Sequence, residues 1–345
     1  MAMSGALLEN LGIVIIGRNE GDRLRQCLRS VVNSTPDIIY VDSGSTDDSV
    51  ALAQFWGIEV LELDLTLPFT AARGRNEGLS RLLQLNPDLT LVQFVDGDCE
   101  VIPGWLERAY TALVEHQDWV VVCGRRRERY PERSLYNLIC DLEWNTPVGE
   151  AKACGGDSMM RIAAWQQVQG FNSSLIAGEE SELCLRLRRQ GGKIMRLEQD
   201  MTLHDAQITR FSQWWQRSVR SGHAYAEGAW LYGQAPERHR LKETKSILLW
   251  GGIVPAIALG SVWLSHGWSL GLFLGYPLMI YKVYRYLKTR YSSRNALIYA
   301  INCILIKFPQ TQGQIQFYLN KIRGKQQTLV EYKRSPIDPN KTSRQ

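Results

Sequence analysis

The feature that most constrains the fold is an alternation of short apolar runs with helix-like segments over the first third of the chain. The run 11–16 has the composition of a strand buried on both faces, and 37–41, 58–63 and 90–95 are the next expected strands. Between them, residues 22–32, 50–56 and 70–85 carry helical spacing or helix-start signals. This order predicts an α/β fold with a mostly parallel, Rossmann-like sheet and helices on both faces.

Polar clusters follow three of these runs directly, at residues 17–20, 42–47 and 96–98. In parallel sheets ligands bind beyond the C-terminal ends of the strands, so we expect a site at this edge. Asp96 and Asp98 are two residues apart on a strand end and point the same way. Two such carboxylates can face one hard cation, Mg²⁺ or Mn²⁺, which usually shares its shell with a substrate diphosphate. A surface turn is the alternative for an isolated Asp-x-Asp.

Two further side chains at this edge have the chemistry to bind a nucleotide. The Asp42 carboxylate could accept from a base N–H, such as that of uracil, or from ribose hydroxyls. Its alternative role is to cap the turn at 44–47. Arg75 could meet the base or the diphosphate, and Arg73 competes with it for that role.

The last third of the chain contains a long uncharged stretch. No Asp, Glu, Lys or Arg occurs in the 36 residues from Ser246 to Tyr281. A bilayer span needs about 20 residues, and the stretch divides at 265–267 into two pieces, 247–264 and 268–284. We therefore expect a helical hairpin at 246–284 that is transmembrane, with a buried hairpin in a soluble domain as the alternative. Basic residues flank only its outer ends, which places both ends in the cytoplasm.

Charge is distributed unevenly. Residues 282–345 hold 13 Lys and Arg against 2 Asp and Glu, whereas the rest of the chain holds 27 against 33. A basic tail on an acidic body suits an anionic surface such as a membrane, and 295–308 suits an interfacial helix. No nucleic-acid module is recognisable, so nucleic acid is not an expected partner. We expect a catalytic domain at 1–235, the hairpin at 246–284, and a basic interfacial helix and tail at 285–345.

Four motifs occur in order: IVIIGRNE at 13–20, VDSGSTD at 41–47, FVDGD at 94–98 and GEESEL at 178–183. Together they resemble the GT-A fold, family 2 glycosyltransferases, over roughly residues 10–230. The resemblance implies inverting transfer from a nucleotide-sugar donor, with UDP- and GDP-sugars the first expectation. It does not identify the sugar.

The resemblance also implies roles for particular residues. The residues expected at the nucleotide sugar are Gly17, Glu20, Asp42, Arg75, Asp96, Asp98 and Asp157. Within that set, Asp98 is expected on the metal with Asp96 beside it, and Asp157 touches the donor sugar or an acceptor hydroxyl. His204 is a candidate third metal ligand or diphosphate contact.

The expected general base is Glu180, at a position where the family usually has Asp, with Glu179 as the alternative. Inversion needs a base that takes the proton of the acceptor hydroxyl, and crowded acids can have the raised pKa that suits this role. The competing explanation is an acidic first helical turn favoured by the helix dipole.

The sequence thus predicts a metal-dependent glycosyltransferase at the inner (cytoplasmic) membrane, with its catalytic domain in the cytoplasm. It would act on a lipid-linked, glycan or other membrane-proximal acceptor in cell-envelope or exopolysaccharide biosynthesis. Two alternatives stay open: a nucleotidyltransferase, and a membrane scaffold with a degenerate transferase domain. A dehydrogenase is disfavoured because the first strand is not followed by GxGxxG. Residues 213–217 are similar to the Gln-x-x-Arg-Trp motif of processive polysaccharide synthases, but in a different order.

Overall fold

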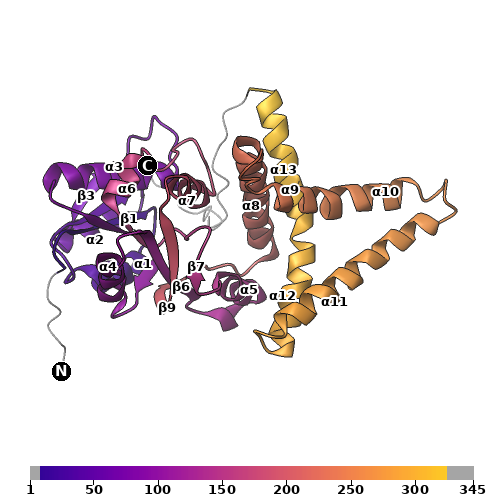
Figure 1. Ribbon diagram of the computed structural model, residues 1–345, viewed down its shortest axis with the longest axis horizontal. Helices are drawn as coiled ribbons and strands as arrows, with labels where there is room; N and C mark the ends of the chain where they lie inside the picture. Colours follow the sequence, from indigo (N-terminus) through magenta and orange to yellow (C-terminus); the bar gives the residue numbers. More distant parts are fainter. Residues whose placement is uncertain (1–7, 325–345) are drawn as a thin grey trace, which may run out of the picture. The chain divides into compact units, whose positions relative to one another are not determined.

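The structure is a computed structural model that describes residues 8–324 (Figure 1). These residues form two compact units. The first contains the chain up to Pro131 and Cys140–Ala206, and the second contains Glu132–Ile139 and the chain from Gln207 onward. Helix α8 (Phe211–Tyr232), which we had assigned to the catalytic domain, lies in the second unit.

A nine-stranded sheet forms the centre of the first unit, in the order β3-β2-β1-β4-β8-β6-β9-β5, with β7 beside β9. Its strands are β1 (Leu11–Gly17), β2 (Ile38–Asp42), β3 (Glu59–Glu62), β4 (Leu91–Asp96), β5 (Cys99–Val101), β6 (Trp119–Glu128), β7 (Gly149–Glu150), β8 (Ser158–Arg161) and β9 (Lys193–His204).

The strand directions divide the sheet into two halves. β3, β2, β1 and β4 are parallel neighbours, as predicted. Beyond them β8 is antiparallel to both β4 and β6, β9 is parallel to β6, and β5 is antiparallel to β9. The sheet is therefore mixed, and the prediction of a mostly parallel sheet was wrong for its second half. The strict strand–helix alternation that requires parallel pairing ends at β4.

Helices cover both faces of this sheet, as predicted. They are α1 (Asp22–Val31), α2 (Ser49–Phe55), α3 (Ala71–Leu85), α4 (Trp105–Glu115), α6 (Ile162–Gln167) and α7 (Glu179–Arg189). Helix α5 (Leu135–Trp144) is divided between the two units after Ile139. Alternate residues of β1 enter different cores because strand side chains alternate between faces. Ile13 and Ile15 pack in one cluster with Leu24 of α1, and Val14 packs in the other with Leu79 of α3.

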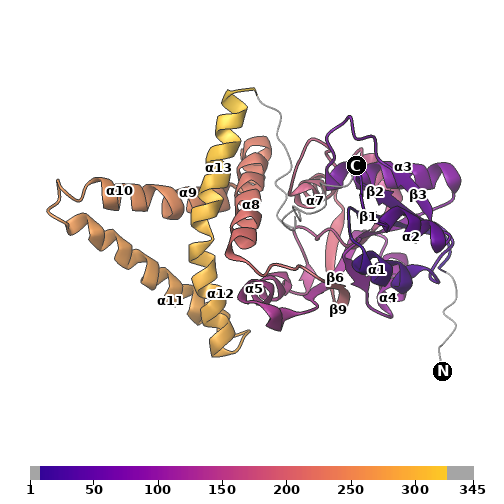
Figure 2. The ribbon, with the colours of Figure 1, turned by 180° about the vertical axis from the view of Figure 1, so that it is seen from behind.

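The second unit is helical. Besides α8 it contains α9 (Leu241–Leu248), a π-helical turn (Leu249–Ile253), α10 (Val254–Gly260), a 3₁₀ segment (Trp268–Leu274), α11 (Gly275–Leu287), α12 (Ser293–Leu305) and α13 (Lys307–Ile322). Figures 1 and 2 show α10 and α11 running out from α13 and meeting at a tip. A hairpin at 246–284 is therefore present.

The transmembrane character of this hairpin is not supported. Within residues 8–324, no helix combines the length and hydropathy that a bilayer crossing requires. The uncharged stretch is split among four short helical pieces, whereas the sequence argument treated each arm as one uninterrupted helix. The stretch at 295–308 is shared between α12 and α13, and it buries Ala296, Ala300 and Ile304.

Candidate functional site

Gly17 and Glu20 lie where β1 ends, at the predicted edge of the sheet. A Cβ on Gly17 would lie 3.1 Å from the ring of Tyr40, so a glycine lets the chain pass close to β2. Glu20 bonds to Arg23 at 2.8 Å, and its main-chain N–H donates to the Ser49 hydroxyl at 3.3 Å. These contacts hold the loop after β1 against the start of α2.

Asp42 ends β2 and is 1% exposed. Its carboxylate accepts from the main-chain N–H groups of Gly44 and Ser45, at 2.9 and 2.7 Å, and from the hydroxyls of Tyr40 and Ser45. Four donors fill the usual capacity of a carboxylate. The capping role is therefore present in the structure, and contact with a base or ribose stays a prediction.

Arg75 of α3 is the arginine that reaches the acidic residues. It is 2% exposed, and its guanidinium lies 2.8 Å from Asp96 Oδ1 and 2.9 Å from Glu179 Oε1. Arg73 points elsewhere and donates to the carbonyl oxygen of Asp64 at 2.9 Å. Arg75 therefore belongs to the acidic cluster and Arg73 does not, and contact of either with a base or diphosphate stays a prediction.

Asp96 and Asp157 are joined by Arg126 of β6. The Arg126 guanidinium lies 2.9 Å from Asp96 Oδ2 and 2.8 Å from Asp157 Oδ2. Burial alone would raise the pKa of Asp96, but Arg75 and Arg126 outweigh it and lower that pKa. Asp157 is fully buried and also accepts from the Asp96 main chain at 2.9 Å and from Thr202 at 2.7 Å. In this arrangement Asp157 positions Asp96, and its contact with a sugar stays a prediction.

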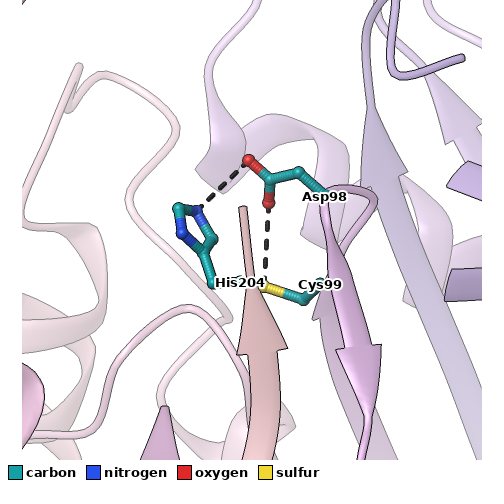
Figure 3. Close-up of side chains that lie close together, drawn as sticks. All are labelled: Asp98, Cys99 and His204. Atoms are coloured by element: carbon teal, nitrogen blue, oxygen red, sulfur yellow. Dashed lines mark hydrogen bonds and ion pairs between the residues drawn. The ribbon is translucent and has the colours of Figure 1, made fainter. Parts of the chain in front are cut away.

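Asp98 and His204 face each other across the pairing of β5 with β9 (Figure 3). Asp98 Oδ2 lies 3.2 Å from His204 Nε2, and both residues are buried. His204 Nδ1 lies 3.7 Å from Glu128 Oε2. At this distance the Glu128 carboxylate is a charged neighbour of the second ring nitrogen, not its hydrogen-bond partner.

Asp98, Cys99 and His204 each offer one possible ligand atom, and these atoms lie within 4.8 Å of one another. Burial raises the pKa of the Cys99 thiol well above its ordinary value, which keeps the thiol protonated and a poor ligand. Both oxygens of Asp96 already accept from arginines. Asp98 and His204 are therefore the pair that fits a divalent ion. An imidazole nitrogen beside a carboxylate suits Mn²⁺ better than Mg²⁺, which prefers oxygen ligands.

The acidic pair lies at the N-terminus of α7, after Gly178, whose φ is +81°. Glu179 is buried against Arg75, and Glu180 Oε1 lies 3.8 Å from the same guanidinium. Burial, and next the charge of Glu179, raise the pKa of Glu180 from an ordinary value near 4.5 to about 7. Of the two, Glu180 has the greater side-chain exposure, 22% against 5%. It is thus the carboxylate better suited to meet a substrate proton at neutral pH.

The sequence analysis missed three residues of this site: Arg126, Glu128 and Trp144. The signal for the first two was available, because Arg126 and Glu128 are two apart on β6 and so share a face of the sheet. No comparable signal marks Trp144, whose ring lies 4.8 Å edge-on from that of His204 and 5.7 Å from the Arg126 guanidinium.

The fold and the acidic, arginine-bridged site define a GT-A-like α/β protein. Residues 12–153 match the model of the family Glycosyl transferase family 2. A glycosyltransferase of Rickettsia conorii, itself uncharacterized, is 42% identical over 59 residues, which cover 17% of this chain and 21% of that protein. The uncharacterized glycosyltransferase YibD of Escherichia coli is 30% identical over 119 residues, a third of each chain. These matches span a fifth to a third of the length of the relatives.

Among solved structures, the mannosyltransferase PcManGT of Pyrobaculum calidifontis, in complex with GDP-Man and Mn²⁺, has a TM-score of 0.54. The similarity covers 90% of this chain and 88% of that one, at 15% sequence identity. At this identity the match concerns the fold alone. It agrees with the GT-A-like architecture predicted from the four motifs.

Proposed function

We propose that this chain is an inverting, metal-dependent glycosyltransferase that transfers a sugar from a nucleotide-sugar donor. The observation that carries the proposal is that Arg75 contacts both the carboxylate next to the expected metal site and the carboxylate next to the expected base. This guanidinium bonds to Asp96, beside the metal pair, and to Glu179, beside the expected base. The family match over residues 12–153 and the names of the relatives support the same reaction class.

In the proposed reaction Glu180 is the general base. Its carboxylate takes the proton of the acceptor hydroxyl as that oxygen attacks the anomeric carbon. The bond from this carbon to the diphosphate breaks on the opposite face, which inverts the configuration. Arg75 acts as a positioning residue, because it holds Glu179 next to the expected base and Asp96 next to the expected metal site.

Asp98 and His204 would hold the divalent ion, with the Glu128 carboxylate as a charged neighbour of the imidazole. When bound, the ion supplies positive charge to the departing diphosphate. Mn²⁺ is the proposed ion because of the imidazole nitrogen. UDP- and GDP-sugars are the proposed donors.

The proposed acceptor is lipid-linked or otherwise membrane-proximal, in cell-envelope or exopolysaccharide biosynthesis. The proposed location is the cytoplasmic face of the inner membrane. Supporting observations are the uncharged stretch at 246–281 and the basic region that follows it.

Donor hydrolysis by the full chain tests the reaction class. UDP-, GDP- and dTDP-sugars are screened with Mn²⁺ or Mg²⁺, alone and with lipid extract as acceptor. We expect metal-dependent release of nucleoside diphosphate, lost in Asp98→Ala and kept in the control Asp88→Ala, whose side chain is exposed. Pyrophosphate as the product would indicate a nucleotidyltransferase, and no turnover under any condition would contradict the proposal.

A further inference from the structure

The hairpin of the second unit exposes an unusual amount of apolar surface. At its tip, Trp263 is 91% exposed, Leu264 87% and Trp268 85%. Further exposed apolar side chains line both arms: Ile253, Ile257, Leu259, Leu270, Leu272, Leu274 and Leu278. Large contiguous apolar patches on a protein surface mark sites that another apolar phase or partner covers.

The three serine hydroxyls near the tip are hydrogen-bonded within the hairpin itself, whereas the imidazole of His266 is exposed. The hydroxyls of Ser261 and Ser269 each donate to a main-chain carbonyl of the first arm, at 2.7 Å. Ser265 donates likewise to Val262 at 3.4 Å and accepts from the main chain of Ser269 at 3.0 Å. Internal pairing of this kind is what a hydrocarbon environment demands, because lipid offers no hydrogen-bond partner.

Charge and aromatic side chains change in order along the second arm. Leu272, Leu274 and Leu278 are followed by exposed tyrosines, Tyr281 and Tyr286, and by exposed cations. These cations are Lys282, Arg285, Lys288 and Arg290, and Lys242 and Lys245 are exposed at the start of the first arm. The order is the one that a membrane surface favours: apolar side chains in hydrocarbon, aromatic rings at the interface and cations at the headgroups.

Acidic groups are few at the basic end of this gradient. No Asp or Glu occurs between Lys282 and Gly324 in the sequence, and Glu243 lies between Lys242 and Lys245 at the start of the first arm. Paired surfaces of two protein copies would be expected to mix both signs of charge, whereas a predominantly basic rim complements anionic lipid headgroups. This charge pattern favours a lipid surface over a second copy of the chain.

We propose that the tip of this hairpin inserts into one leaflet of an anionic membrane, with the basic residues at its base resting on the headgroups. At about 2.0 Å per residue in the 3₁₀ segment and about 1.5 Å in α11, the arm from Trp268 to Lys282 is roughly 25 Å long. This exceeds the depth of one leaflet of a hydrocarbon core of about 30 Å but falls short of crossing it. The insertion rests on the membrane-proximal acceptor of the proposed function, but membrane binding itself can be measured without catalysis.

Vesicle flotation with the full chain tests the insertion. The probes are vesicles of phosphatidylcholine, with and without phosphatidylglycerol, and no donor is present. We expect binding to the mixed vesicles and a loss of about a hundredfold in Trp263→Glu/Leu264→Glu. The matched control Phe55→Glu/Leu85→Glu changes two exposed apolar residues of the first unit, 84% and 50% exposed, and should bind like the wild type. Lys282→Gln/Arg285→Gln should weaken binding by roughly fivefold per lost cation, and only where phosphatidylglycerol is present.

Two further measurements distinguish a failure of membrane insertion from a failure of the proposed reaction. Lipids brominated at different depths should quench tryptophan fluorescence in the wild type, and less so in Trp263→Phe, which keeps an apolar side chain. Donor hydrolysis in the tip variant should equal that of the wild type, so a failure of the proposed reaction and a failure of insertion are seen separately. Equal vesicle binding by tip variant and wild type would overturn the proposal. So would a wild type that dimerises in light scattering and ignores vesicles, because a second copy would then cover the tip.

Discussion

The change Glu180→Gln should have opposite effects on activity and stability. Burial and Glu179 raise the pKa of Glu180 to about 7, against about 4.5 without them. Below pH 4.5 the side chain is protonated in both folded and unfolded states, so glutamate and glutamine are equivalent there. As pH rises to 7 the unfolded chain loses the proton first, and the folded wild type becomes less stable. At 1.36 kcal/mol per pKa unit, the variant should exceed the wild type by up to about 3 kcal/mol above pH 7.

Thermal melting from pH 5 to pH 8 measures this difference. For a unit of about 200 residues, about 3 kcal/mol corresponds to a rise of roughly 6–12 °C in melting temperature. Activity should fall by about a hundredfold or more in the same variant, because the base is lost. Glu115→Gln, at an exposed position on α4, is the control and should show neither effect. A stability difference that does not vary with pH would refute the assignment of a raised pKa to Glu180.

Three other variants test the supports of the site. Glu128→Gln should weaken Mn²⁺ binding by about 10–100-fold in calorimetry, because it removes the negative charge beside the His204 ring; unchanged affinity would count against that role. Gly156→Ala should lower kcat by about a hundredfold, since the new Cβ would lie 2.5 Å from a nitrogen of the buried Arg75. Gly155→Ala has nothing within 4 Å and should be neutral, so equal effects would exclude this explanation. Asp157→Ala removes one of the two carboxylates that pair with Arg126, and with it the acceptor for the Asp96 main chain and the Thr202 hydroxyl. It should cost about 3–5 kcal/mol in urea unfolding; a cost below 1 kcal/mol would contradict it.

The parallel half of the sheet was predictable because its central strands β1, β2 and β4 are largely single apolar runs. The run at 11–16 became β1 (Leu11–Gly17), and that at 90–95 became β4 (Leu91–Asp96). By contrast β9 (Lys193–His204) was missed, because its apolar residues are interrupted by charged ones and its pairing with β6 shifts register at several points. Each shift breaks the alternation on which strand prediction depends.

The sequence could place Asp96 and Asp98 at one edge of the sheet but not their partners. Asp96 ends β4 and meets two arginines, whereas Asp98 lies in the turn that follows and meets His204. The site was not predictable where the rotation of a helix about its axis decides which side chain points toward the site. Arg73 and Arg75 are two residues apart on α3, which turns them about 200° from each other, and only the packing of α3 on the sheet selects Arg75. The expected transmembrane character of the hairpin is unsupported for a related reason. Hydropathy summed over 246–281 does not reveal the π-helical and 3₁₀ segments that divide the stretch.

The balance of charge at the site couples binding of the proposed divalent ion to the pKa of Glu180, the proposed base. The site contains the guanidiniums of Arg75 and Arg126. It contains more carboxylates than guanidiniums, namely those of Asp96, Asp98, Asp157, Glu179 and Glu180. The excess of negative charge helps to keep the pKa of Glu180 high, because Glu179 and Asp96 both raise it. A divalent ion beside Asp98 would reduce that excess and favour the ionised form of Glu180. By linkage, ionised Glu180 must strengthen ion binding to the same degree. The proposed base is therefore better prepared to accept a proton once the proposed metal is in place.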